Sequence, residues 1–492
     1  MTTGNKDAVY NRSSSVLAGR LRRDLGTLES YAALLGILIG AGIFTVTSQA
    51  WSITGPSVIL GYILLLPVIL ATSVPYAAFL STPLGQEPGG EYTHISQTFG
   101  GYLIAFIGTW LKIISYIGAL AFLAGALADY IIKFAGEWMD PKTYYLPLAL
   151  SSLVLFYLIH IIGVRWFGRL QVVMCILLGI SLIVLIVPGL FAIQTINYQP
   201  FITHGWEGLA ASLVPLFFSY AGFESLAQTA GEVKDSTERL PQVFLKGITL
   251  TAVIFVLMSA IAFGVLPGTR LQASRAPMAE VASVYLPFGA ALFVTFGAIM
   301  AITTSLNSTM LVPSRMTIML ASDGLAPGWL GVIHKSTGTP IRGLTLTLMA
   351  SAFLLISGQV SLALNIAVFA LVLLYFLHSL TFLLLPRRNP QLYSMIKISL
   401  SLTLQKMAAL LSMLAMGGII VIQVVQDLRT LQTQSFLQRL ASHSLTSVEL
   451  VLAWGLVGAL LYGYSCWRRD PNVRDDKSSR EKIAVYNDED RF

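Results

Sequence analysis

The chain has 492 residues, of which 55% are hydrophobic and 11% are charged, whereas soluble domains carry about 25% charged residues. This composition excludes a soluble globular protein and indicates a membrane protein with many spans. The formal net charge of +7 does not indicate a nucleic-acid partner, because the basic residues follow the expected membrane topology.

Apolar runs that suit membrane spans recur along the whole chain, since a span takes about 20 residues. The twelve runs are 31–53, 57–80, 102–134, 145–163, 170–193, 209–229, 243–266, 282–311, 342–357, 362–386, 404–425 and 448–467. The ninth is short. The first lacks a small-residue cleavage site, so we expect it to insert as a span and not to be a removable signal peptide.

Basic residues are divided unequally between the two expected sides of the membrane. Of 31 Lys and Arg residues, 24 fall in the two ends and alternate loops that share one side, and six fall in loops of the other side. Positively charged loops stay inside, so both termini are expected in the cytoplasm of a cell that carries the protein in its inner or plasma membrane. We expect a cytoplasmic segment 1–30, a ten-helix core 31–390, two additional spans in 391–467 and a cytoplasmic tail 468–492.

The first span contains the stretch Gly36-Ile-Leu-Ile-Gly-Ala-Gly-Ile-Phe44. Gly40 and Gly42 favour an interruption of the helix, and irregular backbone inside a membrane is found where it is buried in protein or lines a cavity. The stretch therefore allows a ligand site. It equally allows close helix packing, because Gly36 and Gly40 have the four-residue spacing of packed helices.

The third span carries a lysine well inside its apolar run. Lys112 lies ten residues beyond Tyr102, which is roughly 15 Å along a helix. An ammonium group at that depth should face water or an acidic partner. The alternative is that the long span begins below the membrane and Lys112 extends to the interface.

The sixth span places a glycine and small and aromatic residues before an acid, in Leu216-Phe-Phe-Ser-Tyr-Ala-Gly-Phe-Glu-Ser225. A carboxylate such as that of Glu224 inside a span indicates a proton site or a cation partner, although a hydrogen-bonded acid can also join helices. The eighth span contains Thr303-Thr-Ser-Leu-Asn-Ser308. Its hydroxyls could satisfy carbonyls of their own helix or bind a hard cation.

The first and sixth spans cross the membrane in opposite directions and lie five spans apart. Two glycine-interrupted spans at corresponding positions of oppositely oriented halves are typical of inverted-repeat secondary transporters. Helix N-termini at the interruptions favour a carboxylate, and unpaired carbonyls favour an ammonium group or a sodium ion. Together they suit an α-amino acid.

Several short motifs occur in a characteristic order. They are Leu21-Arg-Arg-Asp-Leu-Gly26, Gly40-Ala-Gly-Ile-Phe44, Gly89-Gly-Glu-Tyr92, Gly222-Phe-Glu224, Gly231-Glu-Val-Lys-Asp-Ser-Thr-Glu-Arg-Leu-Pro241, Ser314-Arg315 and Ala321-Ser-Asp-Gly-Leu-Ala-Pro327. In this order the chain resembles the amino acid–polyamine–organocation (APC) superfamily, as an amino acid permease, over roughly residues 20 to 390. The resemblance implies an all-α membrane protein of twelve transmembrane helices with a 5+5 inverted repeat, as in the leucine-transporter fold, and discontinuous helices 1 and 6.

The resemblance also implies a substrate site. The backbone around Gly40, Ala41 and Gly42 would hold the substrate carboxylate. The α-amino group would be held by carbonyls at Ile39, Ser219 and either Ala221 or Gly222. Tyr220 or Phe223 would be the aromatic gate. The complete substrate-binding set is Ile39, Gly40, Ala41, Gly42, Ile43, Ser219, Tyr220, Ala221, Gly222 and Phe223.

Three coupling modes are compatible with the resemblance. Related proton-coupled proteins carry a lysine in span five where this chain has Leu178, and Glu224 matches an acid used in proton sensing. Sodium-coupled relatives place hydroxyl ligands at the positions of Thr304 and Ser305, opposite the carbonyls of Gly36 and Ile39. Sodium, a proton or substrate exchange is therefore expected to drive transport, with Lys112 as a further coupling candidate.

These observations predict a secondary amino acid transporter that works by alternating access, without enzymatic chemistry, an organic cofactor or a nucleic-acid partner. The sequence does not specify the side chain of the substrate or the oligomeric state. One alternative is a polyamine or amine carrier, which would need carboxylates beyond Glu224. Another is an amino acid sensor that does not transport, for which a folded extramembrane domain is expected.

Overall fold

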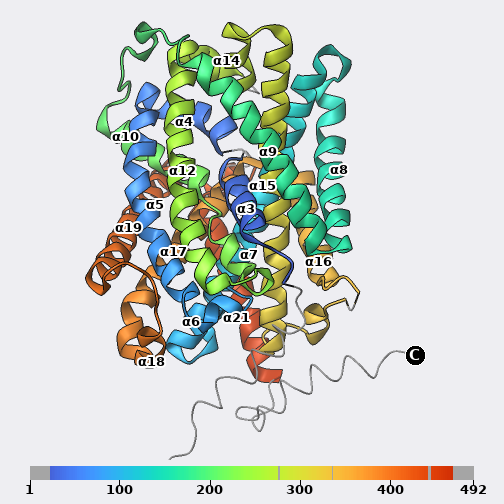
Figure 1. Ribbon diagram of the computed structural model, residues 1–492, viewed down its shortest axis with the longest axis vertical. Coiled ribbons are helices and arrows are strands. Elements are labelled where there is room, and N and C mark those ends of the chain that lie inside the picture. Colours follow the sequence, from blue (N-terminus) through green and yellow to red (C-terminus); the bar gives the residue numbers. More distant parts are fainter. Residues whose placement is uncertain are drawn as a thin grey trace, which may run out of the picture.

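A computed structural model of the chain describes residues 23–40, 42–274, 277–334, 336–358, 360–441 and 445–468. Throughout these residues the regular structure is helical, and an isolated bridge joins Leu25 to Val233 (Figure 1). Among the residues that the structure describes, eleven helical stretches are long and apolar enough to cross a membrane, and α16 (Ile341–Ile356) is a shorter apolar helix. The described chain is therefore a multi-pass membrane protein.

The helices that correspond to the predicted runs extend beyond several of them, by seven residues at the start of the seventh run and by eight at the end of the eleventh, and the ninth run corresponds to α16. The others are α3 (Thr27–Leu38), α4 (Thr47–Thr54), α5 (Val58–Leu80), α7 (Tyr102–Ala135), α8 (Pro141–Ile162), α9 (Val164–Gly189), α10 (Gly205–Tyr220), α12 (Ser236–Val265), α15 (Phe288–Ser322), α17 (Val360–Arg388), α19 (Leu402–Thr433) and α21 (Ser447–Arg468). Short connecting helices are α6 (Glu91–Phe99), α11 (Ser225–Gln228), α13 (Gly268–Ala273), α14 (Pro277–Tyr285), α18 (Pro390–Ser394) and α20 (Phe436–Ala441).

The predicted boundaries of the eighth run, 282–311, were wrong at both ends. Residues 277–285 form the separate helix α14, and α15 begins at Phe288 and continues to Ser322. Pro287 separates them as the N-cap of α15, because a proline disfavours helical geometry in the residue before it and suits the start of a helix.

The first and sixth spans are both interrupted. Helix α3 ends at Leu38, and a π-helical turn from Gly42 leads into α4. Helix α10 ends at Tyr220, and α11 begins at Ser225. Between them Gly222 has a φ of 103°, a conformation that favours glycine.

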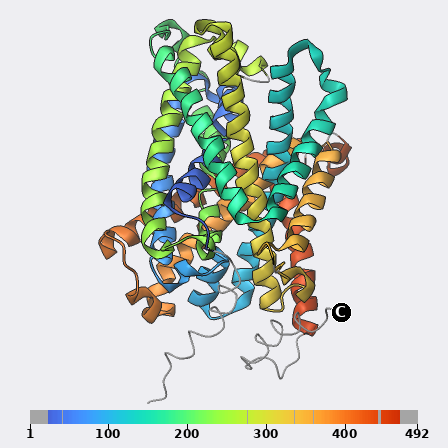
Figure 2. The same cartoon turned by 45° about the vertical axis from the view of Figure 1, so that its right-hand side comes forward.

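Helix α7 lies at the centre of the bundle and packs against α15 and α17, while α9 and α12 pack against α3 (Figure 1). In the view of Figure 2, α6, α18 and the last turns of α21 lie at one end of the bundle, which we call the lower end. Helices α13 and α14 lie toward the opposite, upper end. The central helices thus bring both interruptions together inside the bundle.

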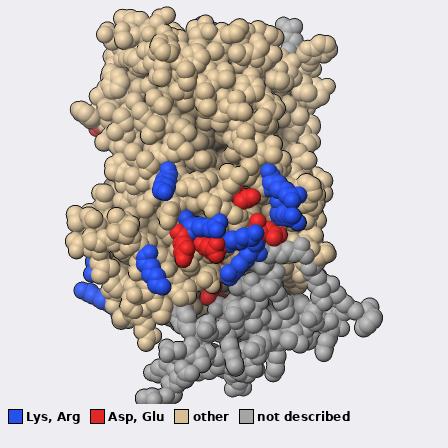
Figure 3. All heavy atoms as spheres, in the orientation of Figure 1, with Lys and Arg blue, Asp and Glu red and all other residues tan. Residues whose placement is uncertain are grey.

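Charged side chains gather over the lower part of the face drawn in Figure 3, and the upper part of that face is almost free of them. This asymmetry agrees with the unequal distribution of Lys and Arg along the sequence. It distinguishes the two ends of the bundle by their electrostatic character.

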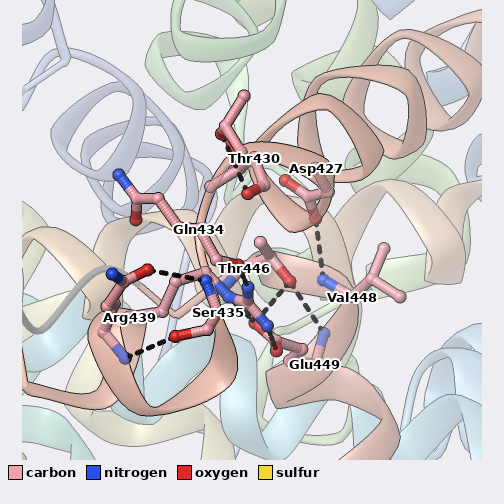
Figure 4. Close-up of polar contacts among 10 residues, drawn as sticks. Asp427, Thr430, Gln434, Ser435, Arg439, Thr446, Val448 and Glu449 are labelled. Carbon is pink, nitrogen blue, oxygen red and sulfur yellow. Dashed lines mark hydrogen bonds and ion pairs between the residues drawn. The ribbon is translucent and has the colours of Figure 1, made fainter.

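The last two long helices are joined by a polar turn (Figure 4). Arg439 of α20 forms an ion pair with Glu449 near the start of α21, and the backbone N–H of Val448 donates to Asp427 of α19 at 2.9 Å. Further down, Trp110 and Trp454 stack at 4.2 Å, and each indole donates to the other residue's carbonyl. These contacts attach the peripheral helix α21 to the bundle.

Candidate functional site

A cavity of about 40 Å³ lies between the two interrupted spans. Its walls come from α3, the π-helical turn after it, α7, α10, the residues after α10, α15 and α17. The lining residues are Ile37, Gly42, Ser115, Tyr116, Ala119, Leu123, Phe218, Ala221, Gly222, Ser305, Thr309 and Leu371. The volume suits a few water molecules or a small polar group.

The interruptions can approach each other only because glycines stand there. A Cβ at Gly42 would lie 2.5 Å from the backbone Cα of Ser219, and one at Gly40 would lie 1.8 Å from the hydroxyl of Ser305. A Cβ at Gly222 would lie 2.9 Å from the side chain of Ile37. The glycine stretches therefore permit close packing and, at the same place, line a cavity.

The predicted substrate-binding residues fall into three groups. Gly42, Ala221 and Gly222 line the cavity, and Ala41 lies outside the described residues. The others do not belong to the cavity wall, and they are buried around it: Ile39, Gly40, Ile43, Ser219, Tyr220 and Phe223. The cavity is also lined by Ile37, Tyr116 and Thr309, which were not predicted. A local motif cannot show which side chains outside it, on the same helix or on other helices, point into a cavity.

The aromatic residues proposed as a gate are held in place by other aromatic residues. Tyr220 packs edge-to-face against Tyr62 at 5.9 Å and donates to its carbonyl. Phe223 stacks on Tyr375 at 5.2 Å and packs edge-to-face against Tyr76. Phe223 lies within the interruption of span six, whereas Tyr220 is the last residue of α10.

Glu224 is fully buried beside this cavity and accepts three hydrogen bonds. Tyr116 donates to it at 2.6 Å, Tyr375 donates to its other oxygen, and the backbone N–H of Gly222 donates at 3.0 Å. Three donors suit an ionised carboxylate, which only accepts. Since Tyr116 also lines the cavity, the carboxyl group of Glu224 is one hydrogen bond away from it.

The groups predicted to bind sodium meet in part. The hydroxyls of Thr304 and Ser305 donate to the carbonyl of Gly36, at 2.9 and 2.7 Å. Ser305 also donates to the carbonyl of Ile37 at 3.0 Å. Oxygen ligands suit a sodium ion chemically, and an ion here would have to replace hydrogen bonds that already join α3 to α15.

Gln171 of α9 occupies the junction between α3 and α15 and was missed by the sequence reasoning. Its amide donates to the carbonyls of Ala32 and Thr304, both at 3.2 Å, and accepts from Asn307 at 2.7 Å. Leu178, the position compared with a lysine, is also buried on α9. Gln171 is a polar residue in an apolar run, and this could have marked it as a candidate. Its partners, however, depend on how α9 is rotated within the bundle.

Lys112 is buried, with 1% of its side chain exposed, and forms an ion pair with Glu91 of α6 at 2.8 Å. The interpretation that it extends to the interface was wrong, because an acidic partner lies within the bundle. Glu91 also accepts from Tyr76 at 2.8 Å and from Gln228 of α11. In the sequence, Glu91 was noted only as part of the motif Gly89-Gly-Glu-Tyr92. Lys112 does not line the cavity.

His160 of α8 makes a contact with α15. Its Nε2 lies 2.9 Å from the carbonyl of Asn307. A second buried ion pair joins Arg315 of α15 to Glu232, which follows α11, at 3.0 Å. The N–H of Leu25 donates to the carbonyl of Glu232 at 3.0 Å, so the start of α3 and the segment after α11 are attached to each other.

Comparison with known proteins gives matches along most of the chain. The family model described as amino acid permease matches residues 25–442. A methylthioribose transporter of Bacillus subtilis is 26% identical over 349 residues, covering 68% of this chain and 74% of that protein. The branched-chain amino acid permease BcaP of Bacillus subtilis is 25% identical, covering 65% of this chain and 71% of that protein. Cationic amino acid transporter 1 of Arabidopsis thaliana is 24% identical, and the match covers 65% of this chain and 55% of that protein.

Proposed function

This chain belongs to the amino acid permease family, and from that premise we propose that it carries amino acids across a membrane by alternating access. Its relatives are transporters, and the chain is not an enzyme. The observation that carries the proposal is the cavity between the two interrupted spans, where backbone groups free of helical hydrogen bonds meet small side chains.

The proposed substrate contacts follow from those backbone groups. The carboxylate of an amino acid would be held by backbone N–H groups at Gly40, Ala41 and Gly42, and its ammonium group by carbonyls at Ile39 and near Ala221. Charge complementarity at interrupted helices supports both assignments. Phe223 would close the site, and Ile43, Ser219, Tyr220 and Gly222 would complete it.

The proposed topology has twelve spans, with α16 counted as the ninth, and both termini in the cytoplasm. Spans one to five and six to ten would form the inverted repeats. The interruptions in spans one and six and the charge asymmetry of Figure 3 support this arrangement. The lower end of the bundle would then face the cytoplasm.

We propose a proton as the coupling ion, bound at Glu224. An acid within a membrane span is a candidate proton site. Glu224 is buried beside the cavity and accepts three hydrogen bonds, which supports that role. A sodium ion held by Gly36, Ile39, Thr304 and Ser305 is the second candidate. It is less favoured because the two hydroxyls already donate to a carbonyl of α3.

Uptake of labelled amino acids into liposomes that contain the purified protein tests the proposal. We expect saturable exchange of at least one amino acid, and accumulation when a proton gradient is imposed that is lost in Glu224→Gln. Accumulation that follows a sodium gradient and is lost in Ser305→Ala would replace the proton by sodium. Absence of binding and transport of every amino acid would refute the proposed substrate class.

The uptake panel should include two other ligand classes. Methylthioribose is included because one relative is a methylthioribose transporter. A diamine is included as the ligand of a polyamine carrier, but the contacts do not favour it, since Glu91 is already paired with Lys112. Binding of an amino acid without transport would instead support a sensor.

A further inference from the structure

Two buried histidines form a pair that the proposed substrate site does not use. His94 of α6 and His378 of α17 have 1% and 0% of their surface exposed, and Nδ1 of His94 lies 3.0 Å from Nε2 of His378. Phe79 stacks on His94 at 4.5 Å, and Tyr76 stacks on His378 at 3.9 Å. The pair is therefore fixed between aromatic rings and joins two helices.

The outer nitrogens of the pair, Nε2 of His94 and Nδ1 of His378, are buried and have no hydrogen-bond partner among the described residues. Buried polar atoms are normally hydrogen-bonded, so two such atoms at the ends of one pair call for an explanation. Each ring is held by packing, which makes the pair a fixed, two-ended chain of ring nitrogens.

The tautomers of two neutral imidazoles decide in which direction this pair of rings can pass a proton. Each neutral ring carries one N–H and one bare nitrogen. If His94 donates to His378, then the outer nitrogen of His94 is an acceptor and that of His378 is a donor, and the reverse tautomers exchange the two ends. A proton accepted at one end, with transfer of the shared proton, releases a proton at the other end. Both rings are then neutral again, in the reverse tautomers. A second proton can follow in the same direction only after the transport cycle has separated the two rings and each has regained its first tautomer by exchanging protons with water.

The pair lies between Glu224 and the lower end of the bundle. Tyr375, which donates to Glu224, precedes His378 by three residues on α17, so both lie on one side of that helix. Tyr76 packs edge-to-face against Tyr375 at 6.1 Å as well as stacking on His378. His94, at the other end of the pair, belongs to α6 at the lower end (Figure 1).

We propose that His94 and His378 form a proton relay between Glu224 and the lower end of the bundle. Water molecules that enter during the transport cycle would connect the outer nitrogens to Glu224 on one side and to the solution on the other. The inference rests on the proposed function, because it supplies the route for the proton that Glu224 would bind.

The charged and titratable groups around the pair come from four helices: Tyr76 of α5, Glu91 of α6, Lys112 of α7 and Tyr375 of α17. Lys112 and Glu91 neutralise each other. Burial, with a smaller contribution from the charge of Lys112, lowers the pKa of His94 to about 3. His94 is therefore neutral at rest, as a relay of neutral tautomers requires.

The experiment compares two activities of the same liposomes: accumulation of amino acid with proton entry, followed by a pH-sensitive dye, and exchange of amino acid without a gradient. The variants are His94→Gln and His378→Gln, which retain hydrogen-bonding groups but cannot pass a proton through an imidazole. His334→Gln is the matched control, since His334 is exposed and lies outside the long helices.

We expect either variant to lower proton-driven accumulation and proton entry by about 100-fold or more, the lower end of the range for single acid–base groups. Exchange should stay within about twofold of the unmodified protein, which also shows that the variant is folded. The control should leave both activities unchanged.

Three results would overturn the relay. Unchanged proton-driven accumulation in both variants would show that protons take another route, and equal loss of accumulation and exchange would show that the pair only packs helices. Exchange by the unmodified protein without any response to a proton gradient would refute the relay while leaving amino acid transport intact. Absence of exchange in the unmodified protein would instead refute the proposed function itself.

Discussion

Replacing Lys112 by methionine should destabilise the protein strongly, because it leaves the carboxylate of Glu91 buried without its cation. Both side chains are at most 2% exposed and their charged atoms lie 2.8 Å apart. Removal of one member of such a pair costs about 3–5 kcal/mol, since the remaining charge is uncompensated. Tyr76 and Gln228 still donate to Glu91, which favours the lower half of that range.

Unfolding of the purified protein in detergent, followed by heat and by denaturant, measures this effect. The double variant Lys112→Met with Glu91→Gln should recover most of the loss, because it removes both charges and keeps an acceptor for Tyr76. Arg270→Met is the control, since the pair of Arg270 with Glu280 is 62% and 22% exposed and should contribute about 1 kcal/mol or less.

The reasoning would be refuted if Lys112→Met unfolded like the unmodified protein, or if the double variant were no more stable than either single variant. Substrate selectivity gives a separate test. Lys112 does not line the cavity, so the double variant should keep the preference among acidic, neutral and cationic amino acids. A changed preference would place the ammonium group in the substrate site.

Three further predictions concern single positions. Gly42→Ala should abolish transport, because the new Cβ would lie 2.5 Å from the backbone of Ser219, whereas Gly179→Ala, with open space around its Cβ, should transport normally in the same uptake assay. Gln171→Leu should lower the free energy of unfolding by about 1–3 kcal/mol, because it leaves buried carbonyls and the amide of Asn307 unpaired; unchanged denaturation would show that water replaces the amide. Below pH 6.5 His94 binds a proton in the unfolded chain but not in the folded one, where its pKa is about 3. The free energy of unfolding should therefore fall as the pH decreases from 6.5. Thermal unfolding measures this slope, which should be smaller in His94→Gln.

The membrane class, most of the spans and the place of both interruptions could be predicted from the sequence. Each depends on local properties, namely the length of an apolar run and the conformational freedom of glycines such as Gly40 and Gly222. The acid of span six could be identified for a similar reason, because an ionisable residue within an apolar run is conspicuous whatever surrounds it. The eighth run shows the limit of this reasoning, since hydropathy continued across Pro287 while the helix did not.

The partners of the polar residues were decided only by the tertiary structure. The depth of Lys112 could be calculated from the rise of a helix, but its direction and its pairing with Glu91 depend on how α6 and α7 are rotated and packed. The contact of His94 with His378 joins residues 284 positions apart. A sequence pattern gives the face of a single helix, whereas the closeness of two faces depends on the tilt and rotation of both helices within the bundle.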